Sequence, residues 1–108
     1  MPPIQILLFV ASIAAASAFT CGSGPFSTFF AKSSIQLDCP EKMDLFDRCC
    51  NSHDQCYDAQ RGRARCDDIF CACLQRAARG SKPCERTDGP AFCWAVRKFG
   101  GSAYRASG

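Results

Sequence analysis

Ten cysteines constrain this chain more than any other feature, because they all fall between residues 21 and 93 of a 108-residue sequence. A domain of this size buries a modest core and is only marginally stable without covalent help. Disulfides supply that help in oxidising compartments, at typically ~2–4 kcal/mol per bridge and not additively. Bound metal is the competing use of so many thiols, but it needs paired C-x-x-C spacings, which this sequence does not show convincingly. We therefore predict one small, disulfide-rich domain.

The first eighteen residues have the pattern of a secretory signal peptide. They contain no charged side chain, and an apolar run over 6–16 leads into Ala16-Ser17-Ala18, a small-x-small cleavage pattern. That run is too short to span a bilayer and no later segment is long enough, so no transmembrane segment is expected. A buried N-terminal helix is the alternative. We predict a signal peptide over 1–18, a single domain over 19–108, and a secreted, extracellular protein.

The charge of the chain is mild. Its formal net charge is +3 at pH 7, and the basic residues are spread along the domain. That distribution argues against nucleic acid as a partner. It would favour an anionic lipid surface by on the order of 1 kcal/mol for each basic residue close to it, although most of these side chains are expected simply to face solvent.

Helical periodicity predicts an all-α, loop-rich domain without strands. The step Cys39-Pro40-Glu41 is typical of a helix start, and Gly62 can end that helix. Between these points, residues recur every three or four positions on one face: Leu45, Cys49, His53, Cys56 and Gln60. Residues 19–34 show no such period and are predicted to form a loop.

Two further helices are predicted downstream. The second ends at Gly80 and carries a clear apolar stripe: Cys66, Ile69, Phe70, Cys73, Leu74 and Ala77. The third is shorter, runs from Asp88-Gly89-Pro90 to Gly100-Gly101, and should turn three residues inward: Phe92, Val96 and Phe99. The tail to Gly108 carries no clear signal.

The cysteines of the first two helices suggest how these helices are joined. Only a short turn around Gly62 separates them, so they should be antiparallel neighbours. Cys49 and Cys56 are seven residues apart on the first helix, and Cys66 and Cys73 are seven apart on the second. Two rungs would then cross-link the helices, Cys56 with Cys66 and Cys49 with Cys73. Spacing alone does not fix connectivity, so this pairing is an expectation.

The only histidine of the chain, His53, lies between these two expected rungs. Asp67, next to Cys66 on the facing helix, should come within about one turn of it. A histidine held by a carboxylate at one ring nitrogen can take a proton from water with the other. The alternatives are structural roles: a hydrogen-bonded core histidine, and an aspartate that favours the N-terminal dipole of its helix.

The sequence around His53 resembles a known active-site motif. Residues 49–57, CCNSHDQCY, are similar to the C-C-x-x-H-D-x-C-Y helix of secreted phospholipases A2. The later Cys66-Asp67 step is similar to the Cys-Asp step of that family, and Cys21-Gly22-Ser23-Gly24 to its C-G-x-G calcium loop. The compact form, without a long N-terminal helix before the loop, is most similar to the insect-venom branch. The resemblance covers residues 20–24 and 47–78.

The resemblance implies a role for each matched residue. His53 would activate a water molecule, Asp67 would orient the imidazole, and Tyr57 would steady the aspartate. Calcium (Ca²⁺) would be held by the side chain of Asp54 and by three backbone carbonyls, those of Thr20, Gly22 and Gly24. Calcium prefers oxygen ligands, and it would supply the Lewis acid that histidine and water lack. The implied disulfides are Cys21–Cys50, Cys49–Cys73 and Cys56–Cys66.

The implied activity is calcium-dependent hydrolysis of the sn-2 ester of glycerophospholipids at a membrane surface, giving a fatty acid and a lysophospholipid. The chain departs from the family where Pro25-Phe26-Ser27 replaces the glycine-rich continuation of the calcium loop. A second hypothesis is therefore a phospholipase-like protein with little or no turnover that binds a membrane or a receptor. A third is a zinc-holding Cys/His module.

Three features stay open. Four cysteines allow three pairings among themselves: Cys39, Cys71, Cys84 and Cys93. Apolar residues near the loop could form either a rim that enters a lipid surface or part of the core: Phe26, Phe29, Phe30 and Ile35. The oligomeric state is not predicted.

Overall fold

The computed structural model describes residues 19–22 and 25–108. Within them the element order is α2 (Pro25–Asp38), η1 (Pro40–Lys42), α3 (Met43–Asp58), α4 (Arg63–Ala78), η2 (Cys84–Asp88), α5 (Gly89–Phe99) and α6 (Gly101–Ala106). The predicted all-α, disulfide-rich fold is confirmed, since these residues contain no strand and their cysteines form five disulfides. No helix in the described part of the chain is both long and apolar enough to cross a bilayer. The predicted signal peptide, 1–18, lies outside the described residues.

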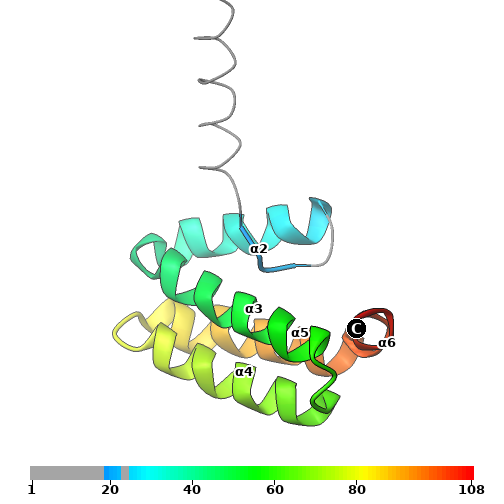
Figure 1. Ribbon diagram of the computed structural model, residues 1–108. Coiled ribbons are helices and arrows are strands. Elements are labelled where there is room, and N and C mark those ends of the chain that lie inside the picture. The colour runs from blue at the N-terminus through cyan, green and yellow to red at the C-terminus, as the bar shows by residue number, and fades with distance from the viewer. Residues whose placement is uncertain (1–18, 23–24) are drawn as a thin grey trace, which may run out of the picture.

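Helices α3 and α4 form the central pair of the fold (Figure 1). They run antiparallel and are cross-linked twice, by Cys49–Cys73 and by Cys56–Cys66. These are the two rungs that the cysteine spacing predicts. Gly62 separates the helices with a φ of 106°, a conformation that glycine adopts at little cost. The tight turn and the two rungs together fix which residues of α3 face which residues of α4.

The segment predicted as a loop over 19–34 is instead helical for most of its length. Helix α2 occupies Pro25–Asp38, where the sequence is rich in serine and threonine and has no clear apolar stripe. Tertiary structure overrides these weak local preferences. Ile35 is fully buried, and disulfide-bonded cysteines flank the helix at Cys21 and Cys39. The prediction was wrong because the constraints on this helix come from distant parts of the chain.

The four cysteines left open by the sequence form two bridges that hold the outer elements in place. Cys39–Cys84 ties the end of α2 to η2, and Cys71–Cys93 ties α4 to α5. The core that these bridges enclose is built from large apolar side chains of α2, α3, α4 and α5: Ile35, Phe46, Leu74 and Phe92.

The third predicted helix is present as α5, but its inward face is narrower than expected. Phe92 and Val96 pack on the core, whereas Phe99 is 65% exposed. The tail that carried no signal forms α6, which lies beside the turn between α3 and α4 (Figure 1). Both C-terminal helices therefore border the interface of the central pair.

Candidate active site

A histidine–aspartate pair lies in the α3–α4 interface. Nε2 of His53 is 2.7 Å from Oδ1 of Asp67, and both side chains are buried. The disulfide rungs place the pair, because His53 lies between Cys49 and Cys56 on α3 and Asp67 follows Cys66 on α4. The hydrogen bond at Nε2 leaves Nδ1 as the ring nitrogen that can act on a water molecule.

Tyr57 supports the aspartate from the next turn of α3. Its hydroxyl donates to Oδ1 of Asp67 at 2.7 Å, and its ring centroid lies 4.2 Å from that of His53. Burial, together with the contact to Asp67, raises the pKa of Tyr57 to about 12. The phenol therefore stays protonated near neutral pH and keeps donating to the carboxylate. Phe70 adds a second aromatic contact to the imidazole, with ring centroids 4.5 Å apart.

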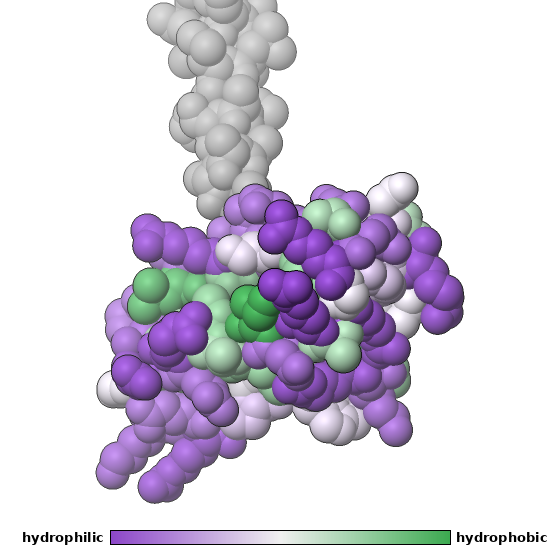
Figure 2. Space-filling view, turned by 60° about the horizontal axis from the view of Figure 1, so that its bottom comes forward, coloured by the Kyte–Doolittle hydropathy of each residue, from purple (hydrophilic) through white to green (hydrophobic). Residues whose placement is uncertain are grey.

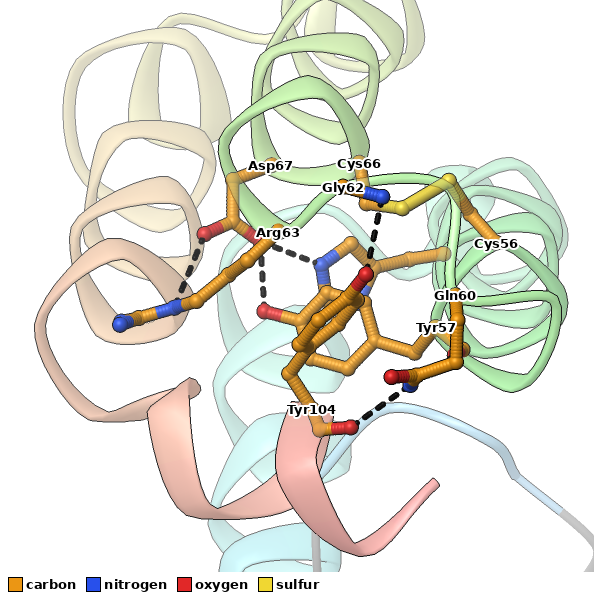
Figure 3. The surroundings of a disulfide bond; sticks show 9 residues. Cys56, Tyr57, Gln60, Gly62, Arg63, Cys66, Asp67 and Tyr104 are labelled. Atoms are coloured by element: carbon orange, nitrogen blue, oxygen red, sulfur yellow. Dashed lines mark hydrogen bonds and ion pairs between the residues drawn. A yellow bond between two sulfur atoms is a disulfide. The ribbon is translucent and has the colours of Figure 1, made fainter. Parts of the chain in front are cut away.

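Arg63 approaches the other oxygen of the same carboxylate (Figure 3). Its Nε lies 3.8 Å from Oδ2 of Asp67, which is ion-pair range and too long for a hydrogen bond. Its Nη2 donates to the backbone carbonyls of Val96 and Arg97, at 3.3 and 2.8 Å. Arg63 thus links the buried carboxylate to the end of α5. Sequence reasoning missed it, although a basic residue four positions before an aspartate on one helix was a usable signal.

Helix α6 closes the same end of the site (Figure 3). The Tyr104 hydroxyl accepts a hydrogen bond from the Gly62 N–H at 2.9 Å, and its ring meets that of Tyr57 edge-on, with centroids 5.1 Å apart. The side-chain amide of Gln60 donates to the Tyr104 carbonyl at 2.7 Å. The chain between α5 and α6 passes so close that a Cβ on Gly100 would lie 2.5 Å from the Tyr57 hydroxyl oxygen. No local sequence signal pointed to these contacts.

His53 also lines a cavity of about 390 Å³ bounded by the segment before α2 and by residues of α2, α3, α4, α5 and α6. Most of the lining is apolar and includes Phe30, Ala31, Phe92, Val96 and Phe99. The polar lining is limited to a few residues, among them His53, Asp54 and Thr20. An apolar cavity with a few convergent polar groups suits an amphiphilic ligand. We call it the front cavity.

Asp54 carries unbalanced negative charge at the edge of the front cavity. Desolvation raises the pKa of its carboxyl above the usual range; His53 opposes that shift, and two acidic neighbours add to it, Asp58 and Asp47. None of the ion pairs among the described residues includes Asp54. A carboxylate with acidic neighbours and no basic partner fits a hard cation, which would relieve the repulsion.

The segment before α2 is closely packed at Gly22. Gly22 has a φ of 100°, and a Cβ there would lie 2.6 Å from the backbone nitrogen of Thr28, so no side chain fits. Thr20 fixes the loop to α3, because its backbone N–H and its hydroxyl both donate to Oδ1 of Asp47, at 2.8 and 2.6 Å. Thr20 and Gly22 line the front cavity together with Asp54.

The donor set fits calcium better than a transition metal. Among the described residues, no group of three or more His, Cys, Asp or Glu side chains could hold a metal ion. A cation at Asp54 would therefore depend on backbone carbonyls, which are oxygen ligands of the kind that calcium prefers. The fourth expected ligand, Gly24, lies outside the described residues. Of the expected ligands, Asp54, Thr20 and Gly22 lie among the described residues, and all three line the front cavity.

The apolar residues near the loop, for which the sequence left open a rim or a core position, lie partly in the core and partly at the surface. Ile35 is fully buried, and the side chain of Phe26 lies outside the described part. Two phenylalanines of α2 are exposed, at 65% and 64%: Phe29 and Phe30. Two aromatic residues of α5 are also exposed and pair edge-on with centroids 5.4 Å apart: Trp94 and Phe99. Phe30 and Phe99 line the front cavity, so exposed aromatic groups of α2 and α5 flank its mouth.

Comparison with known proteins points in the same direction as the site. The chain is 47% identical over 88 residues to Phospholipase A2-like protein Y52B11A.8 of Caenorhabditis elegans, a match that covers 82% of this chain and 51% of the relative. The chain thus spans about half the length of that curated relative. No protein-family model matches the sequence, and no solved structure matches it. The identity supports a relationship to phospholipase A2-like proteins.

Proposed function

We propose that the protein is a secreted, calcium-dependent phospholipase A2 that releases the sn-2 fatty acid from glycerophospholipids and leaves a lysophospholipid. The observation that carries this proposal is the buried His53–Asp67 pair beside an apolar cavity that Asp54 also lines. Five disulfides fit an oxidising, extracellular setting.

In this proposal His53 is the general base. Its Nδ1 takes a proton from a water molecule as the water oxygen attacks the ester carbonyl carbon. Asp67 holds the proton at Nε2, which fixes the tautomer and stabilises the imidazolium that forms. When the carbon–oxygen ester bond breaks, His53 returns the proton to the departing alkoxide. Asp54 and the backbone carbonyls of Thr20, Gly22 and Gly24 would hold calcium. The ion would supply a Lewis acid that polarises the ester carbonyl of the substrate.

The surface around the front cavity supports a lipid substrate. Two exposed aromatic residues line the front cavity, Phe30 and Phe99, and each pairs edge-on with a further exposed aromatic ring, that of Phe29 or Trp94. Aromatic rings, tryptophan above all, favour the boundary between water and an apolar phase. A phospholipid could then pass from a bilayer into the cavity without leaving an apolar surrounding.

A phospholipase-like binding protein without turnover remains the second candidate. The specific observation in its favour is the altered continuation of the calcium loop, where Pro25-Phe26-Ser27 opens a helix in place of further glycine-rich loop. This candidate uses the same cavity and aromatic rim but holds calcium too weakly to drive hydrolysis.

A calcium titration separates the two candidates. Purified protein is added to vesicles that contain phosphatidylcholine and phosphatidylglycerol. Released fatty acid is then measured as the calcium concentration is raised to millimolar levels. Release should rise with calcium, fall to background with chelator and return when calcium is restored, because the Lewis acid is required. Magnesium serves as the control cation. Vesicle binding without any release, together with no calcium binding by calorimetry, would favour the second candidate.

Arg63 should act as a positioning residue for Asp67. Changing Arg63→Met is expected to lower kcat about two- to fivefold with little change in KM, since a part-exposed ion pair contributes on the order of 0.5–1 kcal/mol. Arg63→Lys should recover part of the rate because it keeps the charge. The matched control is Arg79→Met, an exposed arginine that ends the same helix away from the site. A fall in thermal stability with unchanged kcat would assign Arg63 a purely structural role.

A further inference from the structure

A second cavity, of about 340 Å³, lies between α3 and α4, and His53 lines it too. Both disulfide rungs line it, as do Ser52 and Gln55 of α3 and Ile69 of α4. His53 and Phe70 line this cavity as well as the front cavity, so they form the partition between the two. We call the second cavity the α3–α4 groove.

The charge lining the α3–α4 groove has one sign. Three arginines contribute to the lining and no aspartate or glutamate does: Arg61, Arg65 and Arg76. Among the described residues, none of the three enters an ion pair, whereas the nearby Arg63 and Arg97 both do. Guanidinium groups that repel one another and lack a partner favour a bound anion, and arginine binds phosphate with paired hydrogen bonds.

The arginines are not evenly placed along the groove. Arg61 lies in the α3–α4 turn and Arg65 in the first turn of α4, at one end of the groove, whereas Arg76 is eleven residues beyond Arg65, which is ~16 Å along a helix axis. Two guanidinium groups at one end can share a single anion. Arg76 is too far from them to bind the same group.

The middle of the groove is apolar. Ile69 lies one turn after Arg65 on the same face of α4 and is 52% exposed. Phe70 and the four rung cysteines also line the groove. Figure 2, which brings the lower side of Figure 1 forward, shows apolar surface bordered by strongly hydrophilic side chains. A partner for such a surface needs both an anionic group and an apolar body.

We propose that the α3–α4 groove binds an anionic amphiphile, an organic phosphate that carries an apolar chain. The phosphate lies between Arg61 and Arg65, and the chain follows Ile69 towards Arg76. This site is separate from the front cavity and does not depend on hydrolysis.

Calorimetry with octyl phosphate, below its aggregation concentration and with chelator present, tests the assignment. Chelator keeps calcium from assisting any binding of phosphate in the front cavity. One octyl phosphate should bind per chain, with inorganic phosphate at least tenfold weaker and octyl glucoside silent, because both halves of the ligand contribute. Arg65→Gln should weaken binding about tenfold, Ile69→Gln severalfold and Arg76→Gln less than Arg65→Gln.

Two control variants locate the ligand. Arg79→Gln removes an exposed arginine outside the groove, and Phe99→Gln alters the front cavity; neither should change the affinity. His53 gives the only histidine signal of the chain. In an NMR titration at a ligand concentration near the wild-type Kd, that signal should move in the wild type and in Phe99→Gln, and move far less in Arg65→Gln.

Several results would overturn the proposal. If octyl phosphate does not bind, the groove is not the proposed site. If inorganic phosphate binds with equal affinity, the apolar part of the groove does not contribute to binding. Loss of binding in Phe99→Gln rather than in Arg65→Gln would place the ligand in the front cavity. An equal loss in Arg79→Gln would show attraction to net charge alone. Unchanged thermal melting of each variant is the check that its fold is kept.

Discussion

Changing His53→Gln is expected to remove phospholipid hydrolysis while leaving the fold intact. Glutamine can still reach towards Asp67 with an amide hydrogen, so the buried carboxylate keeps a partner. It cannot accept a proton from water near neutral pH, so the rate should fall by ~10²–10⁴, the usual contribution of a positioned general base. The measurement is initial release of fatty acid from vesicles at saturating calcium.

The matched control for this variant is Asn51→Ala. Asn51 is exposed on the same helix, two residues from the histidine, and lines neither cavity. It should retain wild-type rates, and both variants should keep all five disulfides and near wild-type melting. A His53→Gln protein with a rate within tenfold of the wild type would contradict the assignment of His53 as base. The phospholipase-like binding hypothesis predicts instead that neither variant differs from a wild type that is itself inactive.

The central helix pair and its histidine–aspartate contact could be predicted from the sequence because their determinants are local. A glycine turn forces α3 and α4 to be antiparallel, and cysteines seven residues apart on each helix set their register. Once the register is set, His53 and Asp67 have to meet. Only the pattern within residues 49–73 is needed for this step.

The surroundings of that contact could not be predicted, because they depend on segments distant in the chain. Helix α2 is held by bridges to α3 and η2, and its own sequence carries no clear stripe. Tyr104 reaches the α3–α4 turn from the C-terminal tail, and Arg63 finds its partners on α5. Phe99 follows the apolar period of its helix, yet it lies at the cavity mouth rather than in the core. Periodicity identifies an apolar face but not what covers it.

Two of the disulfides, removed one at a time, should differ in their effects on stability and on activity. The Cys39–Cys84 bridge joins residues 45 positions apart and ties α2 to η2, away from the histidine. The Cys56–Cys66 bridge joins residues only 10 apart, but it flanks the site. Loop-closure entropy assigns roughly 4 kcal/mol to the first and roughly 3 kcal/mol to the second. Replacing both cysteines of a bridge by alanine should therefore destabilise the fold more for the longer bridge.

Activity should follow the opposite order. The folded Cys39→Ala/Cys84→Ala protein should keep most of its specific activity, since neither position touches the His53–Asp67 pair. The Cys56→Ala/Cys66→Ala protein should lose far more, because the rung beside Asp67 sets its distance from the imidazole and misplacement by about 1 Å can cost ~100-fold. Denaturant unfolding gives the stabilities, and vesicle hydrolysis at low temperature, corrected for the folded fraction, gives the rates. If both variants lost activity only in proportion to the protein unfolded, the rung would serve the fold alone, and the register of the pair would have to come from packing.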